Sequence, residues 1–379
     1  MLATLACGGG DGRDSATSGE THFPEMVVPS DNPMTAERIA LGRYLFHDFR
    51  MSRNSERSCG ICHEPAKGFT DGFSRAVGTT GETHTRNTLS LINVGYRERL
   101  NWRDPEMRLL EDQWHGPMFG EEPVEMGMTP DDIVSRLGSI ARYPPMFVEA
   151  FPDDEQPLST RNIGRALASF QRTIVGGDSA YDRWLKGEED AMSDQAIAGL
   201  DVFAREGCDR CHGGIFFDQP HDENGSPSTR HGYANTGLYN VDGDGGYPNH
   251  EPGLIASSGV PGDMGRFRIP SLRGVAETGP WSHDGTSLSL AAVVGAYARG
   301  GRLVSHPDYA GDGATSPLKS PMVEAFDLTR SDEEALIAFL SSLSDHSLMA
   351  RPDLQTPFCL MVNGEATNPP CESWTPIVD

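Results

Sequence analysis

Two copies of one short cysteine motif constrain this chain more than any other feature. Each copy has the pattern C-x-x-C-H, and the copies begin at Cys59 and Cys208. Two thiols three positions apart can form thioether bonds to neighbouring vinyl groups of one porphyrin, and the histidine that follows can then ligate the iron. The sequence therefore predicts two covalently bound c-type haems, held by Cys59, Cys62 and His63 and by Cys208, Cys211 and His212.

Zinc ribbons and thioredoxin-type redox pairs use similar cysteine spacings. A zinc site would place both cysteine pairs around one metal, usually within a few tens of residues. Here about 150 residues separate the pairs, and each pair has its own adjacent histidine. This arrangement favours two separate haem sites.

Composition excludes several classes of partner. The 379 residues carry a formal net charge of -24 at pH 7. Nucleic acids and anionic membrane surfaces require basic patches, so the sequence predicts neither as a partner. No apolar run approaches the roughly 18 residues that would span a bilayer.

The three remaining cysteines lie near the ends of the chain. Because haem c is attached outside the bacterial cytoplasm, Cys359 and Cys371 can form a disulfide there, although free thiols are the alternative. Cys7 ends a Thr-Leu-Ala-Cys string that resembles a lipobox, and a Gly/Ser/Asp/Thr-rich tether follows it. We expect a periplasmic or exported protein with a lipid anchor at Cys7. The other interpretation is that Cys7 is incidental.

Apolar residues recur mainly at helical spacing, and alternating strand patterns are scarce, so the sequence predicts an all-α fold. Thr129 and Ser193 are expected to cap helices, and Ser331 with Glu334 resembles a capping box. A glycine pair at 176–177 marks a boundary between two cytochrome domains. The expected organisation is a signal remnant or lipoprotein tether over 1–33, a first haem domain over 34–177, a second haem domain over 178–350 and a tail over 351–379.

Longer strings resemble the bacterial di-haem cytochrome c peroxidase and MauG superfamily from about Pro33 to Asp345. The matching strings include 41–46, 59–71, 86–88, 123–127, 267–273 and 283–285. Within this superfamily the segments at 101–102, 117–121, 235–243 and 263–268 are most similar to MbnH-type enzymes. The resemblance implies that each C-x-x-C-H motif is the centre of a helical domain wrapped round one haem.

The resemblance implies an open, peroxide-reacting haem at the first motif. Its distal pocket corresponds to Gln113, Pro117 and Glu125, where a carboxylate can move a proton between the two oxygens of peroxide. Peroxidases of this superfamily also use an inhibitory histidine, and its position is occupied by Thr79. We therefore expect the first haem to stay permanently open.

At the second haem the resemblance places Tyr297 where the peroxidases have a methionine ligand. A phenolate ligand stabilises ferric and higher iron, whereas methionine raises the potential. Trp102 would lie between the haems as an electronic bridge. The resemblance also implies an inter-haem calcium site formed by Asn87 with the carbonyl groups of Thr278 and Pro280.

These features predict a haem-dependent oxidoreductase of the MauG and MbnH type, with hydrogen peroxide as its oxidant. Its substrate would be an aromatic residue of a partner protein, and a tryptophan converted to kynurenine is the product that the resemblance implies. The partner would be copper-binding and encoded nearby. In MauG a tryptophan six residues before the second proximal histidine conducts the oxidising equivalents outward, but this chain has Glu206 there.

Two alternatives remain open at this point. One is a di-haem cytochrome c peroxidase that detoxifies hydrogen peroxide with a small redox protein as electron donor. The other is an electron-transfer cytochrome without enzymatic activity, in which both irons would be closed by six ligands.

Overall fold

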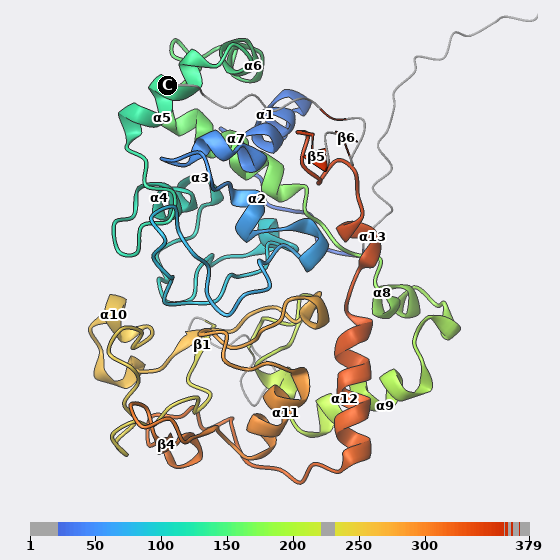
Figure 1. The fold of residues 1–379 in the computed structure, drawn as a ribbon. Coiled ribbons are helices and arrows are strands. Elements are labelled where there is room, and N and C mark those ends of the chain that lie inside the picture. The colour runs from blue at the N-terminus through green and yellow to red at the C-terminus, as the bar shows by residue number, and fades with distance from the viewer. Residues whose placement is uncertain (1–21, 221–231, 360, 363–364, 367–370, 372–379) are drawn as a thin grey trace, which may run out of the picture.

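A computed structural model describes residues 22–220, 232–359, 361–362, 365–366 and 371. The described chain forms two lobes, one above the other in Figure 1, and each contains one C-x-x-C-H motif. The first lobe contains α1 (Ala36–His47), α2 (Cys59–Cys62), α3 (Leu110–Gln113), α4 (His115–Phe119), α5 (Pro130–Ser139), α6 (Tyr143–Ala150) and α7 (Thr160–Arg172). The second contains α8 (Ala180–Leu185), α9 (Asp194–Arg205), α10 (Ile255–Ser258), α11 (Leu290–Ala298) and α12 (Arg330–Ser342), after which α13 (His346–Met349) returns to the first.

Strands contribute little to the described part of the chain. They form three antiparallel pairs of two-residue strands. The pairs are β1 (Tyr233–Ala234) with β2 (Phe267–Arg268), β3 (Leu303–Val304) with β4 (Gly311–Asp312), and β5 (Met361–Val362) with β6 (Glu365–Ala366). The architecture is therefore helical with long irregular segments, as the scarcity of alternating patterns predicts.

A closely packed helix pair supports each lobe, and a glycine lies at each crossing. In the first lobe α1 crosses α7, and a Cβ on Gly42 would collide with the carbonyl group of Ala166. In the second lobe α9 crosses α12, and a Cβ on Gly199 would collide with the carbonyl group of Ala335. A core phenylalanine follows each glycine by four residues, Phe46 after Gly42 and Phe203 after Gly199. Residues four apart lie on the same face of a helix, so this face carries both the glycine of the crossing and a buried ring.

Buried apolar residues form separate clusters around these two helix pairs. The largest cluster includes Leu41, Phe46, Phe147 and Phe170 of the first lobe, all at most 1% exposed. The second cluster is centred on Phe203 and residues of α12. A third, smaller cluster combines Trp102 from the first lobe with aromatic residues of the second.

Helix caps agree with the sequence pattern at two of three positions. Thr129 accepts a hydrogen bond from the Asp132 N–H at the start of α5, and Ser193 caps α9 in the same way. The capping box expected at Ser331 is wrong, because α12 begins earlier and Thr329 is its N-cap. The Thr329 hydroxyl is bonded to both the N–H and the carboxylate of Asp332, which satisfies the helix start before Ser331 is reached.

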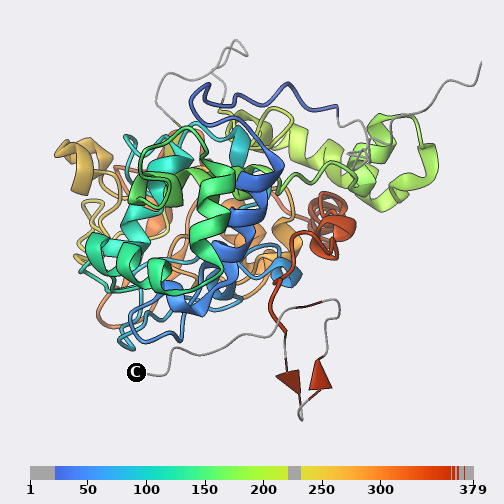
Figure 2. The same cartoon turned by 90° about the horizontal axis from the view of Figure 1, so that it is seen from above.

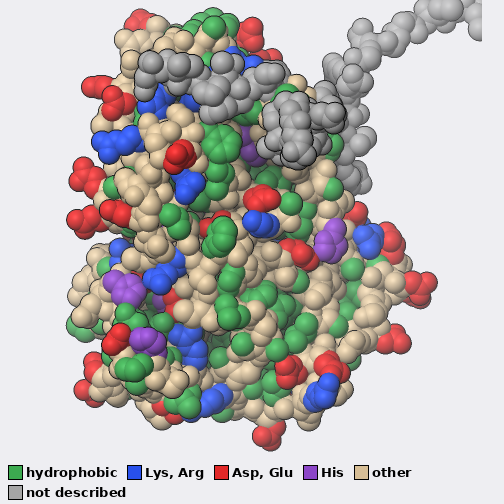
Figure 3. Space-filling view, in the orientation of Figure 1, with side chains coloured by type: hydrophobic (Ala, Val, Ile, Leu, Met, Phe, Trp, Pro, Cys, Tyr) green, Lys and Arg blue, Asp and Glu red, His purple; other side chains and the backbone are tan. Residues whose placement is uncertain are grey.

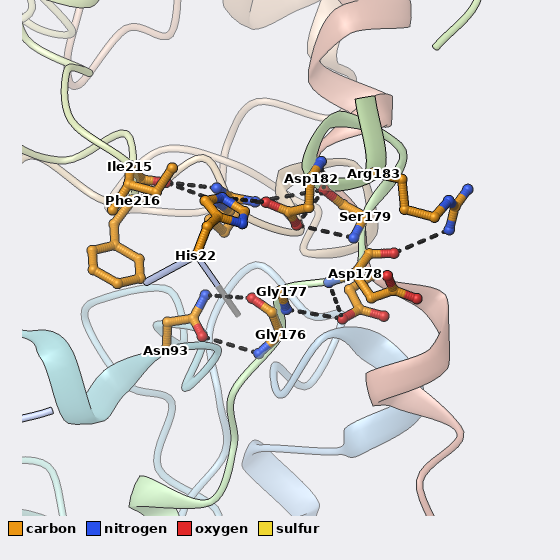
Figure 4. Close-up of polar contacts among 12 residues, drawn as sticks. His22, Asn93, Gly176, Gly177, Asp178, Ser179, Asp182, Arg183, Ile215 and Phe216 are labelled. Carbon is orange, nitrogen blue, oxygen red and sulfur yellow. Dashed lines mark hydrogen bonds and ion pairs between the residues drawn. The ribbon is translucent and has the colours of Figure 1, made fainter. Parts of the chain in front are cut away.

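The segment between the lobes is held in place by side chains from both of them (Figure 4). Asn93 pairs with Gly176 through two hydrogen bonds of 3.0 Å, one to its carbonyl oxygen and one from its N–H. Asp345 accepts hydrogen bonds from the N–H groups of Gly177 and Asp178. Because these backbone groups are bonded on both sides, the link is a fixed part of the structure rather than a free tether.

The two ends of the chain are only partly described. Cys7 and most of the expected tether lie outside the described residues. At the other end Cys359 and Cys371 form a disulfide, which closes a hairpin that projects from the main body in Figure 2. Among the described residues no helix is both long and apolar enough to cross a membrane.

Candidate haem and peroxide site

A cavity in the first lobe brings together every residue predicted for the first haem site. It has about 1370 Å³ of empty space, including its opening to solvent. Cys59, Cys62 and His63 line it from the haem motif, and Trp102, Gln113, Pro117 and Glu125 line it from other segments. The sequence separates these groups by up to 66 residues (from 59 to 125), so their convergence is a property of the fold.

Each proximal histidine is oriented by a backbone carbonyl group. Nδ1 of His63 lies 3.0 Å from the oxygen of Phe69, and Nδ1 of His212 lies 3.0 Å from the oxygen of Phe217. Both phenylalanines have positive φ angles, 60° and 55°, which are unusual for bulky residues. A donor bond from Nδ1 to a carbonyl leaves Nε2 available to a metal, as at many histidine–metal sites.

The motif cysteines fit a thioether-linked group better than a zinc ion. All four are free thiols in the structure. Burial is the largest effect on these thiols, and it raises the pKa of Cys59, Cys62 and Cys208 to about 12. Burial also raises the pKa of Cys211. Zinc requires thiolates, and no group of three or more His, Cys, Asp or Glu side chains within the described residues is arranged to hold a metal ion.

Backbone pairing places the residues predicted for the distal side together in the wall of the cavity that His63 also lines. Gln113 is the last residue of α3 and Pro117 lies in α4. The N–H of Met126 donates to the carbonyl oxygen of Pro117, and the N–H of Met128 donates to that of Met118. This pairing holds Glu125 beside α4.

An ion pair fixes α3 against α7. The Glu111 carboxylate accepts hydrogen bonds of 2.6 and 3.0 Å from the guanidinium group of Arg172. Although burial opposes ionisation, Arg172 and Asn32 lower the pKa of Glu111. Gly164 lets the two helices approach closely, because a Cβ there would collide with the Glu111 carbonyl group and the Trp114 ring. Gln113 is thus held by a buried framework.

The structure adds His84 to the distal pocket. Its Nε2 lies 3.0 Å from Oε1 of Glu125, and the His84 side chain is 15% exposed. The sequence pattern gave His84 no role, because Thr79 occupies the position of the inhibitory ligand. A signal was present, since the Gly-x-x-Gly segment at 78–81 is a turn that returns the chain beside Ala76.

Thr79 lies near the tip of this turn and is held there. Its N–H donates to the carbonyl oxygen of Glu125, and its hydroxyl is bonded to Asn54. Two backbone hydrogen bonds close the hairpin on either side of this turn. The Gly78 N–H donates to the Glu82 carbonyl oxygen, and the His84 N–H donates to the Ala76 carbonyl oxygen. Thr79 therefore offers no strong iron ligand from this turn, whereas His84 and Glu125 line the cavity itself.

Tyr297 lies on α11 of the second lobe and is half-buried. Burial raises its pKa, and the nearby Cys211 and Cys208 thiols act in the same direction. Leu290 and Val294 on the same helix are buried in the core. The structure therefore brings Tyr297 into the neighbourhood of the second haem motif. Glu206, by contrast, ends α9 in an ion pair of 2.7 Å with Arg205.

Trp102 connects the two lobes. It lines the cavity of the first lobe, is 8% exposed, and packs with Tyr247 and Phe267 of the second. Its Nε1–H donates to the Asn87 carbonyl oxygen at 2.8 Å, and its own carbonyl accepts from Arg268 N–H at 2.9 Å. Contacts with both lobes hold the Trp102 indole in place. An indole in this position can couple groups in one lobe to groups in the other.

The residues expected at the calcium site also lie at the lobe interface. Three hydrogen bonds hold Asn87 in place. Its side-chain amide nitrogen donates to the carbonyl oxygens of Phe73 and Ser74, and its backbone N–H donates to the carbonyl oxygen of His283. Thr278 packs against the turn at Gly68, where an added Cβ would lie 2.9 Å from its methyl group. Pro280 follows two residues later. Asn87 and Thr278 are therefore both placed where the two lobes meet.

Charge over the surface is mixed. Figure 3 shows acidic and basic side chains interspersed on one face rather than one continuous basic area.

Comparisons with known proteins identify the family of this chain. The family model described as di-haem cytochrome c peroxidase matches residues 36–190. The methylamine utilization protein MauG of Methylorubrum extorquens is 34% identical over 84% of this chain and 82% of its own length. Cytochrome c551 peroxidase of Pseudomonas aeruginosa is 30% identical over 95% of this chain and 92% of its own length.

Among solved structures, a MauG-like protein associated with microbial copper homeostasis matches with a TM-score of 0.83 and 39% identity. The match covers 89% of this chain and 98% of that one. Relatives of this kind are haem-dependent oxidoreductases that use peroxide, and the present chain is such an enzyme. The chain belongs to the di-haem cytochrome c peroxidase family that includes MauG.

Proposed function

We propose that the protein is a MauG-type oxidase that uses hydrogen peroxide to oxidise a tryptophan of a partner protein to kynurenine. The observation that carries the proposal is the position of Trp102, which borders the peroxide cavity on one side and the aromatic cluster of the second lobe on the other. Such a bridge serves an enzyme that passes oxidising equivalents outward.

The first lobe would activate peroxide. When bound to Cys59, Cys62 and His63, the haem would supply an iron that reacts with hydrogen peroxide. Glu125 would accept the proton of the inner peroxide oxygen and deliver it to the outer one, which makes water the leaving group. His84 holds Oε1 of Glu125 at 3.0 Å, and Gln113 positions or excludes water.

The second lobe would hold oxidising equivalents rather than receive electrons from a carrier. Cys208, Cys211 and His212 would attach its haem, and Tyr297 would ligate the iron through the phenolate oxygen. Such a ligand lowers the potential of the haem and favours its oxidised forms. We further propose that the two lobes are two c-type haem domains, that Asn87, Thr278 and Pro280 hold calcium between them, and that the protein is exported to the periplasm with a lipid anchor at Cys7.

Similarity to the copper-homeostasis protein supports a protein substrate. That protein shares 39% identity with this chain over nearly its whole length. Because the haem-motif residues and the distal residues that line the first cavity are buried or half-buried, a folded partner cannot place a side chain on the reacting oxygen. Oxidation would therefore proceed by electron transfer over a distance. The partner we propose is a copper-binding protein encoded nearby.

Mass spectrometry of the partner tests this function. Conversion of one tryptophan to kynurenine and formate consumes two hydrogen peroxide molecules, and the modified side chain gains one oxygen and loses one carbon. Incubation of the two-haem enzyme, peroxide and the neighbouring copper-binding protein should give this mass change on one tryptic peptide. Glu125→Gln should abolish the change while the two proteins still bind each other.

The alternative is a peroxidase that detoxifies peroxide with a small electron-donor protein. The 30% identity to cytochrome c551 peroxidase over 95% of this chain supports it. Rapid peroxide consumption with a reduced cytochrome, together with an unchanged mass of the neighbouring protein, would decide for this alternative. Two six-coordinate haems without any peroxide reaction would decide for a simple electron carrier.

A further inference from the structure

A row of aromatic side chains leads from Trp102 to the surface of the second lobe. Trp102, Phe267, Tyr247 and Tyr239 pack in one buried cluster, and each is at most 8% exposed. Tyr309 packs against this cluster and is half-buried. The cluster therefore extends from the wall of the peroxide cavity to solvent.

From Phe267 outward, neighbouring rings in this row are close enough for short electron-transfer steps. The ring centres of Tyr247 and Phe267 are 6.0 Å apart, those of Tyr247 and Tyr239 are 5.4 Å apart, and those of Tyr239 and Tyr309 are 6.1 Å apart. Beyond Tyr309 lie two exposed histidines, His306 stacked at 5.6 Å and His250 at 6.1 Å.

Tyr239 has a partner that suits reversible oxidation. Its hydroxyl donates to Oδ2 of Asp284 at 2.6 Å, and the guanidinium group of Arg302 lies 4.7 Å from its ring centre. A phenol that loses an electron becomes strongly acidic, so a carboxylate already hydrogen-bonded to it can accept its proton without diffusion. Arg302 and Thr286 also contact Asp284 and keep the carboxylate in place.

Before oxidation, the proton of this pair lies on the Tyr239 phenol and not on the Asp284 carboxylate. Burial, followed by the Asp284 charge, raises the pKa of Tyr239 to about 12, so the phenol is protonated at neutral pH. Burial works against ionisation of Asp284, but His283, the Tyr239 hydroxyl and Arg302 together lower its pKa. The proton thus rests on Tyr239 until an electron leaves.

Tyr247 lacks such an acceptor. Its hydroxyl donates to the amide oxygen of Asn235 at 2.9 Å and accepts from the Leu238 N–H at 3.1 Å. An amide oxygen is a weak base, so oxidised Tyr247 would keep its proton and be costly to form. Within this cluster Tyr239 is therefore the side chain that can hold an oxidising equivalent as a transient radical.

We propose that Tyr239, with Asp284 as its proton acceptor, is a redox relay that passes oxidising equivalents to a partner protein docked over Tyr309. This inference rests on the proposed function. Tyr239 gives one electron to the oxidised haem pair and its proton to Asp284. Tyr309 then gives an electron to the Tyr239 radical, Asp284 returns the proton, and Tyr309 regains an electron from the partner's aromatic side chain. Each hydrogen peroxide molecule drives two such passes.

Freeze-quench EPR of the two-haem enzyme without partner tests the relay directly. Wild-type enzyme mixed with peroxide should give a tyrosyl radical signal that narrows when the protein is made with ring-deuterated tyrosine. Tyr239→Phe keeps the ring packing and should remove the signal. Asp284→Asn keeps a hydrogen bond but no proton acceptor, and should reduce the signal by about tenfold or more.

Tyr143→Phe is the matched control. The Tyr143 hydroxyl also donates to a carboxylate, that of Asp48, but it lies in the first core cluster rather than in the aromatic row. This variant should keep the radical. Loss of the signal in Tyr143→Phe with retention in Tyr239→Phe would overturn the relay, and so would wild-type enzyme that gives no tyrosyl signal.

A second measurement separates the relay from the proposed substrate. Partner oxidation by Tyr239→Phe and Tyr309→Phe should slow by about tenfold or more, whereas the first reaction with peroxide keeps its wild-type rate. Full partner oxidation by both variants would overturn the relay but leave the proposed function intact. A normal radical in an enzyme that leaves the partner unmodified would reject the proposed substrate and keep the relay.

Discussion

At the scale of single residues, Glu125 and His84 form the hydrogen-bonded pair on which we propose that peroxide cleavage depends. Glu125 lies on a segment held against α4, whereas His84 lies on a hairpin held by its own backbone bonds. Two separate backbone segments therefore fix one hydrogen bond. A general base in such a pair keeps its orientation while it gains and loses a proton.

We expect His84→Gln to act differently from Glu125→Gln. Glu125→Gln removes the base and should slow the reaction with peroxide by about 100-fold or more. His84→Gln retains a hydrogen-bond donor and should cost about tenfold, because Glu125 stays in place but loses the imidazole that holds its Oε1 oxygen. Stopped-flow spectra after mixing with peroxide measure both effects. Equal losses in the two variants would contradict the role of His84.

Tyr297 is the second residue with a separable role. We expect Tyr297→Phe to bind both haems, to react with peroxide at the first one and to lose the long-lived oxidised state, because the phenolate ligand is missing. Redox titration should show a changed potential for the second haem only. An unchanged titration and spectrum would make Tyr297 an ordinary core residue.

At the scale of elements, the two glycine crossings set the geometry of both lobes. Gly199 lies where α9 meets α12, so Gly199→Ala must push the helices apart and should destabilise the protein by about 2 kcal/mol or more. The matched control is Gly138→Ala in α5, where the nearest atom is 3.5 Å from the added Cβ. That change should be neutral or stabilising by about 0.5–1 kcal/mol, because alanine favours a helix. Urea unfolding of the haem-loaded protein measures both.

A buried histidine at the end of α1, His47, leads us to expect that the protein loses stability in acid. His47 is buried there, and its Nε2 lies 3.0 Å from the Leu354 carbonyl oxygen. Burial lowers the pKa of His47 to about 4, below the value of 6.5 in the unfolded chain. The unfolded state therefore takes up a proton as pH falls from 6.5 towards 4, and stability falls over the same range.

For this single group the expected loss between pH 7 and pH 5 is about 2 kcal/mol. His47→Gln should flatten the pH dependence of the unfolding free energy by about this amount, even if the variant is less stable at pH 7. The measurement is urea unfolding at several pH values. A slope identical to that of the wild type would show that His47 does not contribute.

At the scale of the whole molecule, Trp102 is the residue that we propose couples the two lobes into one redox system. Trp102→Phe should bind both haems and react with peroxide, because the cavity lining around Glu125 is unchanged. It should lose the near-infrared band of two electronically coupled haems and most of its partner oxidation. Normal partner turnover would reduce Trp102 to a packing role.

Calcium removal gives a test of the lobe interface. If Asn87, Thr278 and Pro280 hold calcium, chelation should weaken the coupling between the two haems while both remain attached through their cysteines. Spectra of the chelated and untreated protein, with calcium restored as the control, measure this effect. Unchanged coupling after complete removal would reject the site.

Local patterns in the sequence by themselves determined much of this protein. The C-x-x-C-H spacing, the helical periodicity, the caps at Thr129 and Ser193 and the family strings depend on residues near one another in the sequence. Short-range chemistry of this kind is readable because few alternatives satisfy it. The cap at Thr329 shows the limit, since two candidate hydroxyl groups competed within three residues and only helix geometry decided between them.

The tertiary structure alone decided which distant side chains share a site. The bond between His84 and Glu125 depends on the turn at 78–81 lying against the segment after α4. Likewise, the path from Trp102 to Tyr309 depends on four segments of two lobes packing into one cluster. Sequence spacing carries no information about such contacts, because their distances are set by how buried helices and loops pack rather than by the local chain.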